Sequence, residues 1–125
     1  MNKQISFLLL ILFLVVPPAY SKDNVVVVKL SGAINPAVAE YVSYEISQAN
    51  VEKDSLIVLH MDTPGGLDTS MREIIKKIQS SEVPVASFVA PTGSRAASAG
   101  TFITIASHIA AMAPGTNIGA AHPVN

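Results

Sequence analysis

Ser98 is the side chain of this sequence whose neighbours best suit nucleophilic chemistry. It lies in the run Arg-Ala-Ala-Ser-Ala-Gly at 95–100, where the small side chains would let a substrate carbonyl come close. We expect Ser98 near the start of a buried helix over 96–107, where free backbone N–H groups and the helix dipole favour an anion. The same run is equally typical of helix packing. It also lacks the G-x-S-x-G pattern, because Ala96 stands at the first glycine position.

Acyl transfer from a serine also needs hydrogen-bond donors for the oxyanion and a proton acceptor. Ala99 follows Ser98 directly, so its N–H can point into the same space. Gly65 and Gly66 lie in the turn 62–66, and glycine lets a backbone approach a ligand closely. The candidate oxyanion hole therefore consists of Gly65, Gly66 and Ala99.

The elements that would position these residues alternate between strands and helices. Continuous apolar runs bounded by turn residues predict strands that are covered on both faces, and apolar residues three or four apart predict helices. Asn35 and Pro36 would begin the first helix, and Asp68 or Thr69 would cap the second. A helix is expected after each of the first three strands, and the expected strands are 25–30, 55–61, 83–89 and 109–113.

This alternation predicts an α/β fold with a mainly parallel sheet and right-handed crossover helices. Sites in such folds form at the carboxyl ends of the strands. The turn 64–66 follows the second strand and the loop 90–95 follows the third, so the two loops can converge at one edge. The glycines and Ser98 are thereby predicted to meet.

The bulk composition limits the classes of function. A chain of 125 residues holds one domain at most. Its formal net charge of −1 gives no basic footprint for nucleic acid. Because cysteine is absent, disulfides, thiolate metal sites and cysteine catalysis are excluded. We expect neither a cofactor nor a metal in the chemistry of this chain.

Residues 1–21 have the pattern of a signal peptide. A short basic start precedes an apolar run over 5–16, Pro17 and Pro18 break any helix, and small residues follow. The apolar run is short for a membrane span, so cleavage before Lys22 is expected, with an uncleaved N-terminal anchor as the alternative. In either case the rest of the chain, 22–125, is expected to be exported.

Three motifs carry a resemblance to a known family. They are Asp-Thr-Pro-Gly-Gly at 62–66, Ser-Arg-Ala-Ala-Ser-Ala-Gly at 94–100 and Ala-Pro-Gly-Thr-Asn-Ile-Gly-Ala-Ala-His-Pro at 113–123. Together they resemble the NfeD family of membrane-bound ClpP-class serine proteases, also called stomatin operon partner proteins. The resemblance runs from about residue 25 to the end of the chain, with the motifs in the family's order and spacing.

The resemblance implies a ClpP/crotonase-like fold and a Ser–Lys dyad in which Ser98 is the nucleophile. It also matches Gly66 and Ala99 to the oxyanion-hole positions. The implied substrates are hydrophobic segments of membrane proteins, including stomatin-like partners. Members of the family usually form homo-oligomers. The implied location is extracytoplasmic or periplasmic, with the full-length protein associated with a membrane.

The general base is the main departure from the family pattern. The family's lysine lies a few dozen residues beyond the serine, and no lysine follows Lys77 in this sequence. We therefore expect 22–125 to be the N-terminal part of a ClpP-like domain, incomplete at its C-terminus and inactive alone. His122 is the alternative base, because it stands close to where soluble Clp proteases place their histidine. His60 and His108 are better explained as structural residues in a strand and at a helix end.

Two other classes of function stay open from the sequence alone. The first is a non-catalytic binding or scaffold module, either truncated or degenerate, which the missing lysine favours. The second is a crotonase-like enzyme that uses Gly66 and Ala99 as donors to a thioester. An export signal argues against the second, because coenzyme A chemistry is normally cytosolic.

Overall fold

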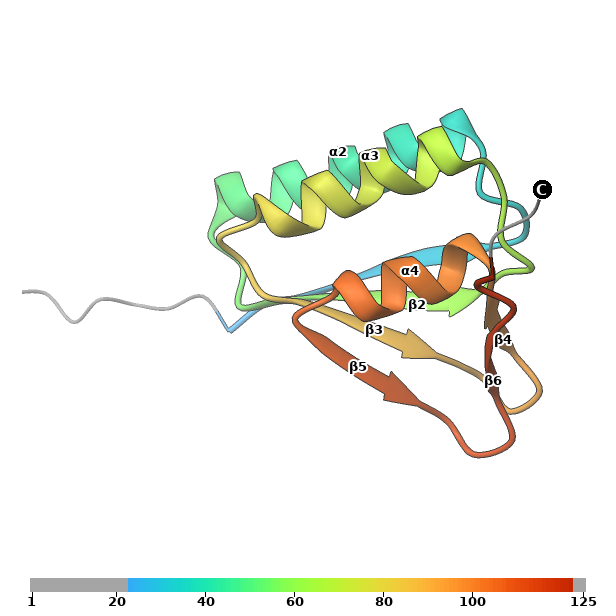
Figure 1. The fold of residues 1–125 in the computed structure, drawn as a ribbon. Coiled ribbons are helices and arrows are strands. Elements are labelled where there is room, and N and C mark those ends of the chain that lie inside the picture. The colour runs from blue at the N-terminus through green and yellow to red at the C-terminus, as the bar shows by residue number, and fades with distance from the viewer. Residues whose placement is uncertain (1–22, 123–125) are drawn as a thin grey trace, which may run out of the picture.

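The computed structural model describes residues 23–122, so the predicted signal peptide over 1–21 lies outside the described residues. Strands and helices alternate as the sequence predicts, with two further short strands near Ser98 (Figure 1). The elements are β1 (Val25–Ser31), α2 (Pro36–Glu52), β2 (Leu56–Asp62), α3 (Asp68–Gln79), β3 (Val85–Val89), β4 (Arg95–Ala97), α4 (Ala99–Ala106), β5 (Ile109–Met112) and β6 (Asn117–Gly119).

The main sheet has four parallel strands in the order β1-β2-β3-β5, so each crossover leads to the adjacent strand. The helices α2, α3 and α4 lie on one face of this sheet, with α3 and α4 side by side (Figure 1). β4 and β6 form a separate parallel pair beyond the carboxyl ends of β2 and β3. The predicted parallel α/β arrangement is thus confirmed.

The helix starts show which local sequence rules hold. The Asn35 side chain accepts a hydrogen bond from the Val38 N–H at 3.0 Å, and Pro36 is the first helical residue, as predicted. The predicted N-cap of α3 was wrong by one or two positions. Leu67 is the residue before its first turn and gives no side-chain cap, while the predicted cap Asp68 is already helical and binds Arg72 at 2.8 Å.

The core lies between the sheet and the three helices. β1 shows this one-sided packing, because Val28 and Leu30 are fully buried whereas Val25 and Val27 are exposed. The expectation of strands covered on both faces is therefore wrong for the described part of the chain. The largest fully buried side chains are Leu30, Ile34, Ile46, Ile57, Leu59, Met61, Ile74, Ile78 and Ile103.

The predicted helix over 96–107 is divided in the structure. Its first two residues belong to the strand β4, and the helix α4 begins only at Ala99. β6, which pairs with β4 in parallel, was not predicted at all. α4 was expected to be buried, but Phe102 and Ile105 on its outer side are exposed. Within residues 23–122, no helix has the length and apolar character that crossing a membrane requires.

Candidate active site

Ser98 occupies the turn between β4 and α4. Its backbone has φ 53° and ψ −117°, a combination that an L-residue adopts only under strain of about 1–3 kcal/mol. The Ser98 N–H is held by the Gly119 carbonyl at 2.8 Å, whereas its hydroxyl has no hydrogen-bond partner within the described residues. A strained strand-to-helix turn that presents a free serine hydroxyl is the geometry of a nucleophile elbow, although the usual glycine pattern is missing.

The glycine turn lies directly against this serine. Gly65 has φ +103°, and a Cβ added there would stand 2.7 Å from Ser98 Cβ and 2.9 Å from the Ala97 carbonyl oxygen. The turn is fastened by Thr63, whose Oγ1 accepts the Gly65 N–H at 3.0 Å and donates to the Gly32 carbonyl at 2.6 Å. Only glycine at position 65 lets the two chain segments come this close.

Gly66 and Ala99 carry the free backbone donors of the site. Ile34 bridges to both sides of Gly66, donating to the Gly65 carbonyl and accepting from the Leu67 N–H, each at 2.9 Å. Because bonding directions alternate along an extended chain, the Gly66 N–H then points away from Ile34. Gly66 is exposed, and its N–H has no partner among residues 23–122. Ala99 is the first residue of α4, so its N–H has no intrahelical acceptor.

These groups share one cavity of about 370 Å³. Ser98, Gly66, Ala99 and His122 all lie on its wall, while Gly65 supports Ser98 from behind. The structure therefore brings the predicted site residues together. No lysine is among the residues that line this cavity, which are Gly66, Asp68, Met71, Ser98, Ala99, Phe102, Ala121 and His122.

The other two histidines have structural environments. The His60 ring meets the edge of Phe88 on the sheet, with ring centroids 6.2 Å apart. His108 Nδ1 accepts the Val85 N–H at 3.0 Å, and the His108 N–H donates to the Val85 carbonyl at 2.9 Å. His108 thus joins the end of α4 to the start of β3, far along the sheet from Ser98.

Two buried threonines hold the site together and were not singled out from the sequence. Thr63 fastens the glycine turn, as described above. Thr101 Oγ1 lies 2.7 Å from the Gly119 carbonyl and accepts the Gly119 N–H at 3.0 Å, which ties β6 to the first turn of α4. Their hydroxyls in otherwise small or apolar surroundings were the available signal.

Solved structures of proteases have this same fold. The chain matches two mutants of the 1510-N membrane-bound stomatin-specific protease, one serine-to-alanine and one lysine-to-alanine in complex with a substrate peptide. Both matches have a TM-score of 0.80 over 84% of this chain, at 39% and 40% identity. They cover 51% and 48% of the solved chains. The predicted ClpP-like fold is confirmed by this likeness.

Curated relatives agree with the structural match. The chain is 37% identical over 122 residues to the membrane-bound protease PH1510 of Pyrococcus horikoshii and 32% identical over 115 residues to the membrane protein NfeD1b of Bacillus subtilis. These alignments cover 98% and 92% of this chain but only 28% and 26% of the relatives. The model of the NfeD1b N-terminal domain matches residues 24–125, and the chain belongs to this family.

Proposed function

We propose that this chain is the nucleophile-bearing part of a serine endopeptidase, with Ser98 as the nucleophile. One observation carries the proposal: the strained turn at Ser98 presents a hydroxyl beside two backbone donors, and none of these groups has a partner among residues 23–122. Strain of this kind persists where surrounding structure imposes it, and it clusters at functional sites. The family membership adds relatives that are named as proteases.

In the proposed reaction, Ser98 Oγ attacks the scissile carbonyl while a base takes the hydroxyl proton. The carbonyl oxygen becomes the oxyanion and accepts hydrogen bonds from the Gly66 and Ala99 N–H groups. The protonated base then gives its proton to the leaving amine, which produces an acyl-enzyme and a released peptide. Water, activated by the same base, hydrolyses the ester. Gly65, which the sequence also predicted for the oxyanion hole, is not assigned a donor role, because its N–H is engaged by Thr63 Oγ1. Its role in the proposal is to keep the turn close to Ser98.

The proposed base is a lysine that lies outside these 125 residues and completes a Ser–Lys dyad. The printed descriptions of the solved relatives, a serine mutant and a lysine mutant with a bound substrate peptide, support this choice. His122 is the alternative base, because it lines the same cavity as Ser98. Within the described residues, no carboxylate is hydrogen bonded to His122 to orient its ring.

The proposed substrates are hydrophobic segments of membrane proteins, including a stomatin-like partner. The stomatin specificity of the solved relatives and the apolar Met71 and Phe102 in the Ser98 cavity support this assignment. The membrane-bound description of the relatives supports a domain that works beside a membrane. The proposed location is extracytoplasmic, for example the periplasm, and rests on the signal-peptide pattern of residues 1–21. We further propose that the protein works as a homo-oligomer.

A fluorophosphonate probe, which labels activated serines, tests the proposal. It should label the longer protein that contains this chain, and Ser98→Ala should abolish labelling and peptide hydrolysis. The expected loss of rate is about 10⁴-fold or more, as for removal of a nucleophile. Ser31→Ala is the control, because Ser31 is an exposed residue at the end of β1 and should be dispensable.

The same probe distinguishes the two bases. Labelling of the 125-residue chain that disappears in both Ser98→Ala and His122→Ala would establish a Ser–His pair. Labelling that requires the longer protein would support the external lysine. A longer protein that still binds hydrophobic peptides but is never labelled at Ser98 would be a binding module and would overturn the protease proposal.

A further inference from the structure

A second cavity, of about 430 Å³, lies directly beside the cavity at Ser98. The two cavities share three wall residues, Asp68, Met71 and Phe102. Met71 is only 8% exposed and forms the floor, whereas Phe102 is 44% exposed and stands beside both spaces. The cavities are therefore two parts of one trough between α3 and α4, which begins at the nucleophile.

This trough is too long for a single side chain. The α3 residues that line it recur every three or four positions from the first residue of the helix, Asp68, to the last, Gln79. At about 1.5 Å per helical residue this stripe is roughly 16 Å long. An extended peptide rises about 3.3 Å per residue, so roughly five residues would fit along it. The length corresponds to a segment of polypeptide lying between the two helices.

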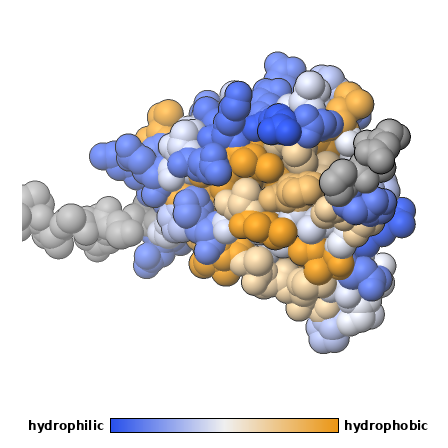
Figure 2. All heavy atoms as spheres, in the orientation of Figure 1, coloured by the Kyte–Doolittle hydropathy of each residue, from blue (hydrophilic) through white to orange (hydrophobic). Residues whose placement is uncertain are grey.

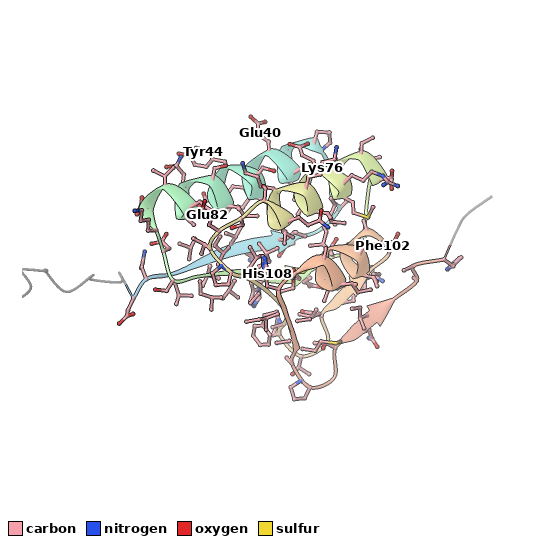
Figure 3. All side chains as sticks on the ribbon, turned by 60° about the vertical axis from the view of Figure 1, so that its left-hand side comes forward. Glu40, Tyr44, Lys76, Glu82, Phe102 and His108 are labelled. Atoms are coloured by element: carbon pink, nitrogen blue, oxygen red, sulfur yellow. The ribbon has the colours of Figure 1, made fainter. Side chains whose placement is uncertain are left out.

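The chemistry of the trough changes along its length. Its middle is apolar, with Ile75 of α3 and Phe102 of α4 on its wall, and Figure 2 shows apolar surface on this side of the molecule that begins beside α3 and extends over α4. Figure 3 shows Lys76 on α3 and Phe102 on the adjacent α4. Arg72 is paired with Asp68 at 2.8 Å, and this hydrogen bond raises the pKa of the Arg72 guanidinium. Within residues 23–122, Lys76 forms no ion pair.

We propose that the α3–α4 trough is a distal substrate-binding site, an inference that rests on the proposed protease function. The part at Met71 holds an apolar side chain next to the scissile bond. The part at Ile75 and Phe102 holds a second apolar side chain about two residues further along the peptide, since the four helical positions from Met71 to Ile75 span roughly 6 Å. An acidic group beyond it pairs with Lys76. The favoured substrate is thus an extended apolar segment that is followed by a negative charge, rather than a single apolar residue.

Peptide binding tests the distal site without requiring catalysis. In a Ser98→Ala background, fluorescence anisotropy measures the binding of two peptides. The long peptide has about ten residues, with two leucines two positions apart followed by a glutamate, and the short one has five residues and only the first leucine. Both chain directions are measured. The long peptide should bind at least about tenfold more tightly, since burial of one large apolar side chain corresponds to that factor or more.

Three variants localise the effect. Ile75→Gln should weaken binding of the long peptide about tenfold and leave the short peptide unchanged. Lys76→Glu, at an exposed position that folding does not depend on, should weaken the long peptide only when it carries the glutamate. Ile105→Gln is the matched control, because Ile105 is 71% exposed on α4 but does not line the trough. It should change neither affinity.

The outcomes separate this inference from the protease proposal. Equal affinity for the two peptides, or an unchanged affinity of the long peptide in both Ile75→Gln and Lys76→Glu, would overturn the distal site even if Ser98 is labelled. Length-dependent binding without any labelling of Ser98 in the longer protein would retain the trough and overturn the protease. Circular dichroism of the Ile75→Gln variant shows whether its fold is intact, because Ile75 is partly buried.

Discussion

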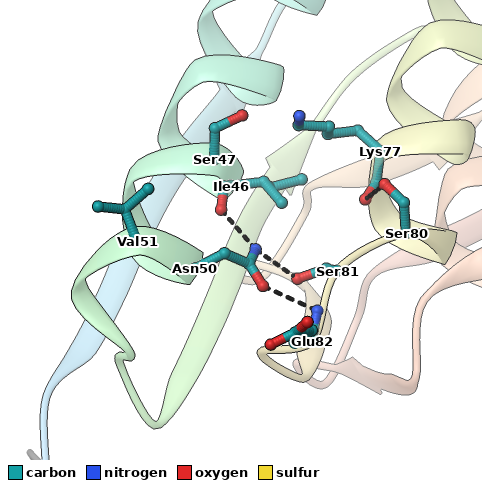
Figure 4. A pocket seen from close by; sticks show the side chains of 8 residues that line it. All are labelled: Ile46, Ser47, Asn50, Val51, Lys77, Ser80, Ser81 and Glu82. Atoms are coloured by element: carbon teal, nitrogen blue, oxygen red, sulfur yellow. Dashed lines mark hydrogen bonds between the residues drawn. The ribbon is translucent and has the colours of Figure 1, made fainter.

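The two ends of the sheet carry cavities of similar size that differ in how far their polar groups are hydrogen bonded. At the amino end, a cavity of about 340 Å³ lies between the last turns of α2 and α3 (Figure 4). The Asn50 side-chain amide is fully hydrogen bonded there, with two bonds donated and two accepted. Its amide nitrogen donates to the Ile46 carbonyl and Ser81 Oγ, and its oxygen accepts the backbone N–H groups of Glu82 and Val83, at 2.7 to 3.0 Å.

At the carboxyl end, the corresponding polar groups are left without partners in the described part of the chain. The Ser98 hydroxyl and the Gly66 N–H are both unpaired, and the backbone at Ser98 is strained. A cavity alone therefore does not mark a site in this molecule. Polar groups that are held rigidly but not yet hydrogen bonded mark it, because a substrate can still satisfy them.

Apart from removal of the nucleophile itself, the largest effect expected at the carboxyl end comes from Gly65→Ala. The new Cβ would overlap Ser98 Cβ and the Ala97 carbonyl, so the glycine turn must move away from the nucleophile. A displacement of about 1 Å at a reacting group can cost about 100-fold in rate. We expect fluorophosphonate labelling of Ser98 in the longer protein to slow by at least that factor.

Gly32→Ala is the matched control for that substitution. Gly32 also has a positive φ, of 78°, but a Cβ there meets nothing within 4 Å. It should cost about 1–2 kcal/mol of stability for the left-handed conformation and leave the labelling rate unchanged. Equal slowing in both variants would mean that backbone strain, and not the close approach of the glycine turn, limits the reaction.

At the amino end, Asn50→Ala should affect stability and not chemistry. It leaves the partly buried Val83 N–H without its acceptor and removes the link between α2 and the loop before β3. An unsatisfied buried donor together with the lost bonds should cost about 2–3 kcal/mol. For a domain of this size that lowers the melting temperature by roughly 10 °C or more, as measured by circular dichroism.

Asn50→Asp sharpens this result, because it keeps an oxygen acceptor for the Glu82 and Val83 N–H groups but loses the donor to Ser81 and to the Ile46 carbonyl. It should recover part of the stability. Neither variant should alter labelling of Ser98 at temperatures where both are folded. If Asn50→Ala slowed labelling as strongly as Gly65→Ala does, the two ends of the sheet would not be independent.

The sequence predicted the regular part of the fold better than the site that the fold supports. β-branched runs and spaced apolar residues are local signals, and they correctly indicated the main strands and helices. The strand β4 has no such signal, since Arg-Ala-Ala favours a helix. Its extended form is imposed by Thr63, whose N–H donates to the Arg95 carbonyl at 2.7 Å, and by pairing with β6. Tertiary partners thus overrode local preference.

The same limit applies to individual site residues. Ser98, Gly66 and Ala99 could be chosen from the sequence because small residues around a serine are visible as a pattern. The strained backbone of Ser98 could not, because it depends on the Gly119 carbonyl that holds the Ser98 N–H from a distant segment. Nor could Asn50 be recognised, since three of its four partners lie more than thirty positions later in the chain.

The smallest expected effect tests the strain at Ser98 directly. Ser98→Gly removes the Cβ that disfavours φ 53° and ψ −117°, which relieves about 1–3 kcal/mol. Glycine costs about 0.5–1 kcal/mol through the greater freedom of the unfolded chain. Ser98→Gly should therefore stabilise the fold by about 1 kcal/mol, measured by urea denaturation. Ser98→Ala keeps the Cβ and should gain nothing, although both variants lack the nucleophile.

Lys53→Gly provides the comparison at the other end of the sheet. Lys53 ends α2 in the left-handed conformation, with φ 57° and ψ 47°, and glycine is favoured there as well. This variant should also be more stable by up to about 1 kcal/mol, but Ser98 should be labelled as before. The stabilised Ser98→Gly variant is thus expected to lose the reaction, whereas the stabilised Lys53→Gly variant is expected to keep it. A Ser98→Gly variant no more stable than Ser98→Ala would show that the turn is relaxed, and the argument from strain to a nucleophile would fail.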